Sequence, residues 1–163
     1  MMKVALGADH AGYELKQSLL AFLNKQGYEV LDVGTDTAEV PSDYPEFSKR
    51  IAEAVLSGKA ERGILVCGSG VGASIAANKI RGIYAGLCHD TYSAHQGVEH
   101  DNMNVICVGS RVIGVELARE IAQAFLKAKF SGEERHVRRF AEVKAIEAQN
   151  LQLPTPGPAV SRK

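Results

Sequence analysis

The stretch RGILVCGSGVGAS, residues 62–74, joins three features that decide the fold. Residues 62–68 form a strand-like run that holds no polar side chain after Arg62, which is typical of a strand buried on both faces of a parallel sheet. Gly68, Gly70 and Gly72 then stand at every second position. A predicted helix over 71–80 follows them. A buried strand that passes through a glycine turn into a helix predicts one unit of an alternating β/α fold.

The same alternation extends in both directions along the chain. Helical spacing of apolar residues, such as Leu15, Leu19 and Leu23, separates further β-rich runs. Strands are predicted over 3–7, 28–34, 62–68, 83–88 and 104–109. Helices are predicted over 14–27, from Phe47 to Val55, and over 71–80, 90–99, 112–130 and 133–149.

Five such units predict an α/β protein with one doubly wound, Rossmann-like sheet of five parallel strands. Helices should cover both faces, with an additional C-terminal helix. The expected strand order is 2-1-3-4-5, with right-handed crossovers. Residues 1–149 should form one domain. Residues 150–163 hold three of the five prolines and show no periodicity, which predicts a flexible or surface-docked tail.

Composition excludes several classes of partner. Lys+Arg and Asp+Glu both number 19, so no basic surplus favours nucleic acid or an acidic membrane surface. The apolar run in MMKVALGADH is too short for a signal peptide, and no stretch approaches the ~18 apolar residues of a membrane span. The three cysteines are widely spaced and form no CxxC pair. We therefore expect a cytoplasmic protein with no structural metal and no disulfide framework.

Ligands of such sheets bind beyond the carboxyl ends of the strands. Three predicted strands end there in polar or reactive residues: Asp9 and His10, Cys67, and Ser110 with Arg111. The glycines after Cys67 allow close approach of a ligand, and N–H groups that open a helix favour negative charge. The same field favours a thiolate, so Cys67 is a candidate nucleophile or base beside an anion site. The alternative is a buried cysteine before an ordinary turn.

More specific motifs fail at this loop. Gly68, Gly70 and Gly72 do not form GxGxxG, and the chain has no GK[ST] of a P-loop. A cysteine phosphatase loop would need arginine where Ala73 stands. Cys88 and Cys107 lack a glycine loop, and Cys107 should be a small core residue.

Two further pairs are candidates for binding. Arg135 and Arg139 lie four residues apart on one predicted helical face, where two guanidinium groups could hold a phosphate. The alternative is a solvated basic face. His100 and Asp101 precede the fifth predicted strand, and by themselves they indicate only a polar turn.

Six motifs stand in an order and spacing that resembles the type B ribose-5-phosphate isomerases, within the LacA/RpiB sugar-phosphate isomerases. The resemblance runs from residue 3 to around residue 148. It rests on GADHAG, DYP (43–45), CGSGVG, AANKIRGI, GSRVIG and RHVRR.

The resemblance implies an isomerase that interconverts ribose 5-phosphate and ribulose 5-phosphate through a cis-enediolate, as in the pentose phosphate pathway, with no metal or cofactor. Cys67 would be the base, Ser69 would orient the base or the substrate, and His100 would help open the furanose ring. The N–H groups of 68–72 would stabilise the enediolate oxygen. The remaining residues would bind substrate: Asp9 the sugar hydroxyls, and His10, Arg135 and Arg139 the phosphate, with Arg111 nearby. The whole expected substrate-binding set is Asp9, His10, Gly68, Ser69, Gly70, Val71, Gly72, Asp101, Arg111, Arg135 and Arg139.

One position departs from the family pattern: Asp101 stands where an asparagine usually follows the histidine. An ionised carboxylate accepts hydrogen bonds but cannot donate them, so the choice of sugar stays open. The alternatives are a tetrose or hexose phosphate such as allose 6-phosphate, or a non-catalytic module that binds sugar phosphates. Cys67 argues against galactose-6-phosphate isomerase subunits that lack this cysteine, and Ala73 against a downstream glutamate base.

The predicted topology also implies a partner. Helix 90–99 should run back across the sheet, so His100 should emerge far from Cys67. We therefore expect a homodimer with composite active sites, which could pair further into a dimer of dimers.

Overall fold

The computed structural model describes residues 1–150, in two compact units that divide between Ser131 and Gly132. The first unit contains five strands: β1 (Lys3–Ala8), β2 (Glu29–Asp32), β3 (Arg62–Cys67), β4 (Ala85–Leu87) and β5 (Val105–Gly109). Its helices are the 3-10 turn η1 (His10–Gly12), α1 (Tyr13–Lys25), α2 (Tyr44–Leu56), α3 (Val71–Ala77), α4 (Thr91–Asp101) and α5 (Val115–Lys127). The second unit contains α6 (Glu134–Asn150). The expected domain limits of 1–149 stay a prediction, and residues 151–163 of the expected tail lie outside the described part.

All neighbouring strands pair in parallel, which confirms the predicted fold class. The predicted strand order is wrong at one edge, because the order is β2-β1-β3-β5-β4. β5 is buried along its whole length, whereas β4 has three residues, all partly or fully exposed. A short strand suits an edge, where one side has no partner. The sequence does not show which of these two strands lies at the edge, because IYAGLC and NVICVG are both continuous apolar runs.

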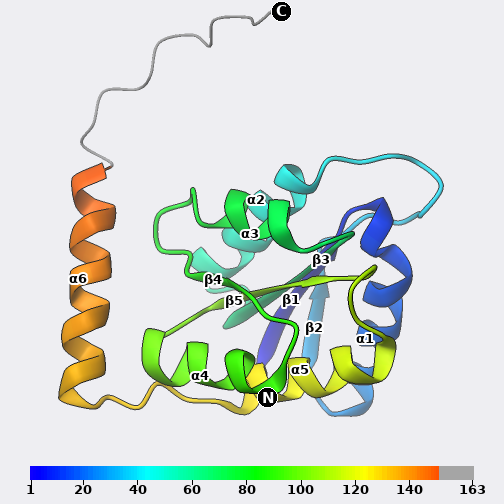
Figure 1. Ribbon diagram of the computed structural model, residues 1–163. Helices are drawn as coiled ribbons and strands as arrows, with labels where there is room; N and C mark the ends of the chain where they lie inside the picture. The colour runs from blue at the N-terminus through cyan, green and yellow to red at the C-terminus, as the bar shows by residue number, and fades with distance from the viewer. Residues whose placement is uncertain (151–163) are drawn as a thin grey trace, which may run out of the picture. The chain divides into compact units, whose positions relative to one another are not determined.

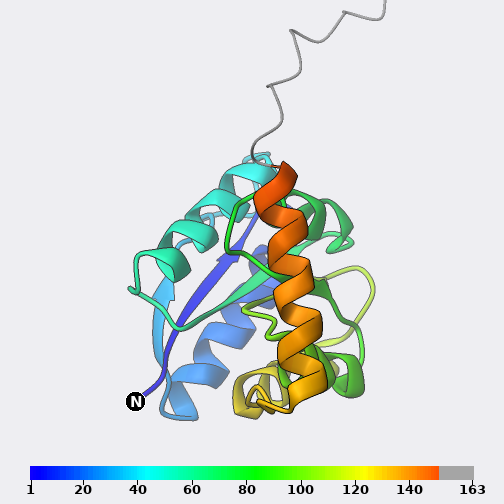
Figure 2. The same cartoon turned by 90° about the vertical axis from the view of Figure 1, so that its left-hand side faces the viewer.

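The strand order fixes which face each helix covers. A right-handed crossover from β4 back to β5 places α4 on the opposite face from α3. Figure 1 shows α2 and α3 above the sheet and α4 and α5 below it, with α1 on the right. The buried leucines of α1 share one core with α4 and α5, so α1 belongs to that lower layer. The view in Figure 2, turned by 90°, shows the same two helical layers.

Alternate residues of each central strand belong to two separate cores, as a period of two requires. In β3, Ile64 and Val66 face the α1, α4 and α5 layer, and Leu65 and Cys67 face the α2 and α3 layer. Cys67 is therefore packed against the second core at the point where β3 ends.

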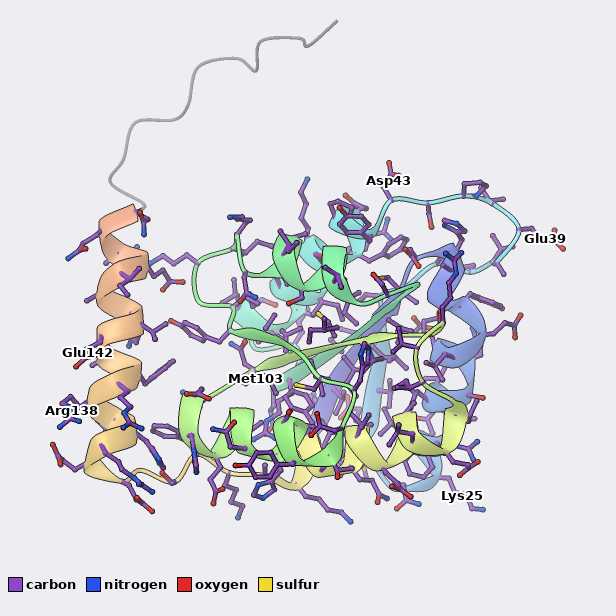
Figure 3. All side chains as sticks on the ribbon, viewed as in Figure 1. Lys25, Glu39, Asp43, Met103, Arg138 and Glu142 are labelled. Carbon is purple, nitrogen blue, oxygen red and sulfur yellow. The ribbon has the colours of Figure 1, made fainter. Side chains whose placement is uncertain are left out.

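The Met103 side chain packs between the edge strand β4 and helix α4 (Figure 3). Its side chain is buried and occupies the space that a side chain would need at Gly86 of β4 or Gly97 of α4. These two glycines therefore allow a large apolar side chain to fill the gap between strand and helix.

Helices α3 and α5 are shorter than predicted. Gly114 and Ala128 both have extended backbone, which limits α5 to 115–127 rather than 112–130. Residues 110–114 instead form a loop at the carboxyl edge of the sheet, which frees Arg111 from helical geometry. Within residues 1–150, no helix is long and apolar enough to cross a membrane.

Candidate active site

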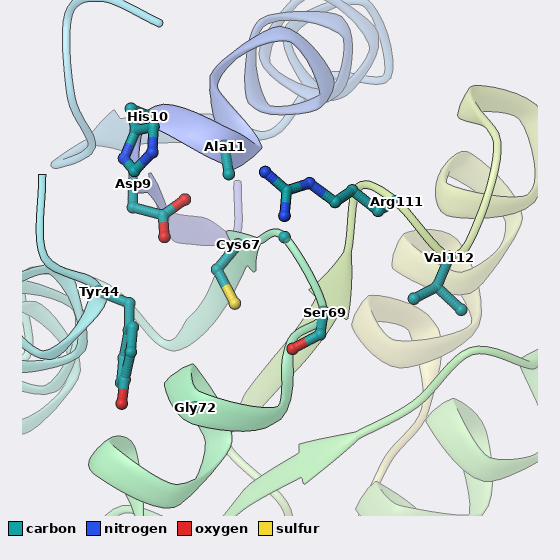
Figure 4. Close-up of a pocket in the computed structure, with 10 residues that line it drawn as sticks. Asp9, His10, Ala11, Tyr44, Cys67, Ser69, Gly72, Arg111 and Val112 are labelled. Carbon is teal, nitrogen blue, oxygen red and sulfur yellow. The ribbon is translucent and has the colours of Figure 1, made fainter. Parts of the chain in front are cut away.

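A pocket of about 350 Å³ opens beyond the carboxyl ends of β1 and β3 (Figure 4). Its volume is in the range of small-molecule sites. Its walls come from η1, the start of α2, the glycine loop and the loop after β5. The lining residues are Asp9, His10, Ala11, Tyr44, Cys67, Gly68, Ser69, Gly72, Arg111 and Val112.

Cys67 lies at the junction of strand and glycine loop, with its sulfur in the pocket. The N–H of Gly70 donates to its Sγ over 3.0 Å. Gly70 has a φ of +81°, a left-handed conformation that strains other residues and that turns this N–H back toward the sulfur. A donor aimed at the sulfur stabilises negative charge there, which suits a thiolate.

Ser69, the second polar side chain of the loop, also accepts a main-chain N–H. Ser69 Oγ accepts the N–H of Val71 over 3.2 Å. The N–H groups of Gly70 and Val71, both expected in the anion cradle, thus point at side chains of the loop itself in this structure. Gly70 and Val71 are also absent from the pocket wall, whereas Gly68, Ser69 and Gly72 belong to it.

Cys88 and Cys107 have different surroundings. Burial, together with the nearby charge of Asp90, raises the pKa of Cys88 to about 11. Burial also raises the pKa of Cys107, whose side chain is fully enclosed in β5. Neither thiol lines the pocket, so Cys67 is the one cysteine placed to meet a ligand there.

Asp9 and His10 are held by short contacts beside Cys67. The buried Asp9 carboxylate accepts the N–H of Gly12 over 3.0 Å and so caps η1. The N–H of His10 donates to Ser42 Oγ over 3.0 Å. The first bond fixes the Asp9 side chain and the second fixes the main chain of His10, both at the end of β1.

Arg111 extends over the glycine loop from the far side of the pocket. Its guanidinium comes within 3.4 Å of where a Cβ of Gly68 would lie. The main-chain N–H of Arg111 donates to Gly68 O over 3.0 Å, and the main-chain N–H of Ser110 donates to Cys67 O over 2.9 Å. These main-chain bonds fix the loop after β5 against the glycine loop, with a cation at the pocket.

Tyr44 also lines the pocket, although the sequence predicts no site role for it. Its ring lies 2.6 Å from where a Cβ of Gly72 would be, so the third glycine of the loop is required by the close approach of this ring. Tyr44 stands in the DYP motif, which was the available signal. Ala11 and Val112 also line the wall, and no pattern in the sequence distinguishes them.

His100 and Asp101 lie away from this pocket. They end α4, which runs back below the sheet toward the start of β5 (Figure 1). Gln96 Nε2 lies 2.9 Å from Nδ1 of His100, and Glu99 Oε2 lies 3.6 Å from its Nε2. The structure therefore does not bring His100 and Cys67 of one chain together.

Arg135 and Arg139 belong to α6, in the second unit. Both are exposed, and Arg135 Nε donates to Glu133 Oε2 over 3.0 Å. Their spacing places them on one face of the helix, as predicted.

The pocket offers polar and ionic groups rather than a metal site. Within residues 1–150, no group of three His, Cys, Asp or Glu side chains is arranged to hold a metal ion. A thiol, a carboxylate, an imidazole and a guanidinium around a polar loop suit a small anionic substrate with hydroxyl groups.

Comparison with known proteins agrees with this arrangement. The family model described as ribose/galactose isomerase matches residues 4–143. The chain belongs to this family. Ribose-5-phosphate isomerase B of Escherichia coli is 46% identical over 147 residues, which cover 90% of this chain and 97% of that protein. D-erythrulose-4-phosphate isomerase of Pectobacterium atrosepticum is 45% identical over 132 residues, 81% of this chain and 87% of that one.

A solved structure of Clostridium thermocellum ribose-5-phosphate isomerase B superposes with a TM-score of 0.88 at 46% identity. The match covers 91% of this chain and 99% of that one. Membership of the ribose/galactose isomerase family confirms the resemblance and the enzyme class expected from the motifs. The roles of individual residues stay predictions.

Proposed function

We propose that this protein is an aldose–ketose isomerase that interconverts ribose 5-phosphate and ribulose 5-phosphate, with Cys67 as the base. The observation that carries the proposal is the placement of Cys67. Its sulfur lies in a pocket with Asp9, Ser69 and Arg111 and accepts the N–H of Gly70 over 3.0 Å. The relatives named above as sugar-phosphate isomerases support this reading of the pocket.

In the proposed reaction, the Cys67 thiolate takes the proton from C2 of the open-chain aldose. The C–H electrons form the C1=C2 bond of a cis-enediolate, and the carbonyl electrons move to O1. Cys67 then returns its proton to C1, the O2 hydroxyl gives up its proton as C2=O2 forms, and O1 takes up that proton to become the hydroxyl of the ketose. The N–H groups of the glycine loop other than those that bond Cys67 and Ser69 stabilise the oxyanion, and Asp9 holds sugar hydroxyls.

The proposed site is completed by a second copy of the chain. His100 would open the furanose ring as a general acid–base, yet it lies at the end of α4, away from Cys67. A homodimer in which each site takes Cys67 from one chain and His100 from the other resolves this separation. Arg135 and Arg139, with His10 and Arg111, would hold the phosphate. Three unpaired cysteines favour a reducing compartment, and we propose the cytoplasm.

A second candidate keeps the chemistry and changes the sugar. The 45% identity to D-erythrulose-4-phosphate isomerase favours a tetrose phosphate as the competing substrate. Asp101 is the residue through which the choice could differ, because its carboxylate accepts hydrogen bonds without donating any.

The test is kcat/KM for a panel of phosphorylated aldoses and ketoses of four, five and six carbons, with and without a chelator. The expected result is the highest value for ribose 5-phosphate, unchanged by the chelator. A higher value for a tetrose or hexose phosphate would reassign the substrate. Binding without turnover of any sugar would identify a non-catalytic module.

A further inference from the structure

The segment 33–43, which carries the Ser42 that contacts His10, is fixed where it begins. The Lys16 side chain is fully buried; its Nζ donates to Asp32 Oδ2 over 2.6 Å and to Thr35 O over 2.9 Å. The other oxygen of Asp32 accepts the N–H of Gly34 over 2.9 Å. The segment then extends through Glu39 and returns at Asp43 (Figure 3).

Where the segment returns, Ser42 offers its main chain to the ring of His10. The Nδ1 of His10 lies 3.0 Å from Ser42 N and 3.1 Å from Ser42 O. The same ring nitrogen therefore faces one donor and one acceptor. Ser42 Oγ also accepts the N–H of His10, which keeps the two residues in register.

This pair of partners satisfies His10 in two protonation states. In the neutral ring, Nδ1 accepts the N–H of Ser42 and the proton resides on Nε2. In the imidazolium, Nδ1–H donates to the carbonyl of Ser42. Nε2 carries a proton in both states, so it remains a donor. Only the Ser42 N–H, which points at Nδ1 of the neutral ring, must turn aside to admit the Nδ1–H of the imidazolium.

His89 provides a contrast within the same unit. Its Nε2 accepts the N–H of Gly109 over 2.9 Å. Within residues 1–150, no carbonyl is a second hydrogen-bond partner of that ring. Nε2 of His89 therefore faces a donor alone, whereas Nδ1 of His10 faces a donor and an acceptor.

Charged and titratable groups reach His10 from several elements. Asp9, at the end of β1, brings a carboxylate into the pocket that His10 lines, and Arg111, from the loop after β5, brings a cation. Cys67 and Tyr44 complete the titratable groups of this pocket. An anion bound here would offset the charge of Arg111 and add negative charge, so both effects would favour imidazolium.

We propose that Ser42 makes His10 a proton-adaptive ligand: the ring takes up one proton from solvent when the anionic group of a substrate binds, and Ser42 O replaces Ser42 N–H as the partner of Nδ1. Ser42 is thus a positioning residue. The proposal rests on the proposed function only in naming that anion as a sugar phosphate.

The test follows the ring nitrogens of His10 by NMR in the full-length protein with ¹⁵N-labelled histidine. Sulfate is the probe, because its own charge does not change near neutral pH. His10→Gln assigns the signals. Without sulfate, at a pH where His10 is neutral, the proton should reside on Nε2; saturating sulfate should convert His10 to imidazolium and leave His89 unchanged. Unchanged His10 nitrogens at the highest soluble sulfate concentration would overturn the proposal.

Calorimetry in two buffers of different ionisation enthalpy counts the proton. We expect uptake of about one proton per sulfate, so that affinity falls by up to about tenfold per pH unit as pH rises. His10→Gln should bind sulfate without that uptake. Ser42→Pro and Ser42→Ala both lose the hydroxyl that accepts the His10 N–H, but only Ser42→Pro also loses the main-chain N–H. In a folded Ser42→Pro variant, His10 should be cationic at a higher pH than in Ser42→Ala. Sulfate bound to the parent protein without proton uptake contradicts the proposal, whatever sugar the enzyme isomerises.

Discussion

Cys67 differs from the other two cysteines in what surrounds its sulfur. It meets a pocket and a main-chain N–H, whereas Cys88 and Cys107 are enclosed by apolar side chains. Since only the thiolate is an effective base or nucleophile, the surroundings of each sulfur decide its reactivity. Two predictions follow from this contrast.

The first concerns catalysis. Cys67→Ala and Cys67→Ser should lower kcat by about 10²- to 10⁴-fold, the usual contribution of a positioned base, while substrate still binds. Cys88→Ala is the matched control, since Cys88 is a buried cysteine outside the pocket, and it should keep kcat. Near-normal turnover in either Cys67 variant would remove this thiol from the mechanism.

The second concerns alkylation. With a pKa of about 11, Cys88 is a thiolate in roughly one molecule in 1,000 at pH 8, and Cys107 less often still. Iodoacetamide should therefore label Cys67 first and inactivate the enzyme, with protection by substrate. Labelling of Cys88 should rise only as pH approaches its raised pKa. Peptide mass mapping that finds Cys88 or Cys107 modified first at pH 8 would refute the contrast.

Substitution of Gly70 tests how much of the site depends on the left-handed φ at that one residue. Gly70→Ala should destabilise the protein by about 1–2 kcal/mol from the left-handed φ alone, and further because a Cβ would come within 2.6 Å of Leu87 Cδ1. Gly27→Ala is matched, with a φ of +85° and open space around it. Urea unfolding should show the smaller loss for Gly27→Ala, and only Gly70→Ala should lose activity.

At the scale of elements, Arg62 joins the start of β3 to the end of α5. Its guanidinium donates to Phe125 O and, over 2.7 Å, to Ala128 O, so it caps the last turn of the helix. Burial lowers the pKa of Arg62 below its ordinary value, and the side chain nonetheless pairs with two carbonyls.

We expect Arg62→Met to lower the free energy of unfolding by about 1.5–3 kcal/mol, since charged hydrogen bonds to the helix end are lost. Arg50→Met is the control: its exposed ion pair with Glu46 should contribute only about 0.3–0.5 kcal/mol. Equal losses in urea unfolding would mean that Arg62 does not cap α5.

Local sequence patterns predicted the helices and strands well, but they predicted the order of the strands in the sheet less completely. Apolar runs and glycine stops predicted all five strands. β1, β3 and β5 are buried as their apolar patterns indicate, whereas the residues of the edge strands β2 and β4 are partly or fully exposed. The order of β4 and β5 was missed because it depends on which strand has neighbours on both sides, and both runs are apolar. Tyr44 was missed as a pocket residue because its role arises from contact with Gly72, far along the chain.

At the scale of the whole molecule, the site residues are divided between regions that no local pattern connects. Cys67, Asp9 and Arg111 share one pocket, whereas His100 ends α4 and the two arginines belong to α6. Motif spacing identified these residues as a group through the family resemblance. Physical reasoning from one chain joins only those at the carboxyl edge of the sheet.

Arg135→Ala and Arg139→Ala should weaken the binding of phosphorylated sugar by about ten- to a hundred-fold in KM, because each charged hydrogen bond contributes about 1.5–3 kcal/mol. Lys144→Ala changes a cation about half a turn around the same helix and should leave KM unaltered. An unphosphorylated sugar should show little change with any variant. Equal effects on both kinds of sugar would assign the pair to structure instead of phosphate.

The separation of His100 from Cys67 leads to the last prediction. Cys67 lies at the carboxyl edge of the sheet, and His100 lies near its amino edge, just before β5 begins. The two edges are separated by the length of a five-residue strand, about 17 Å, which is too far for both residues to touch one small sugar. In a two-fold dimer with composite sites, mixing Cys67→Ala and His100→Ala chains creates heterodimers with one intact site and one doubly damaged site. Dissociation and reassociation should therefore restore activity, to about one quarter of the parent value for random pairing. Cys67→Ala mixed with Asp9→Ala is the control: both residues line one pocket of one chain, so every site stays damaged. Heterodimers of the first pair that form but remain inactive would place both residues in the same site of a single chain.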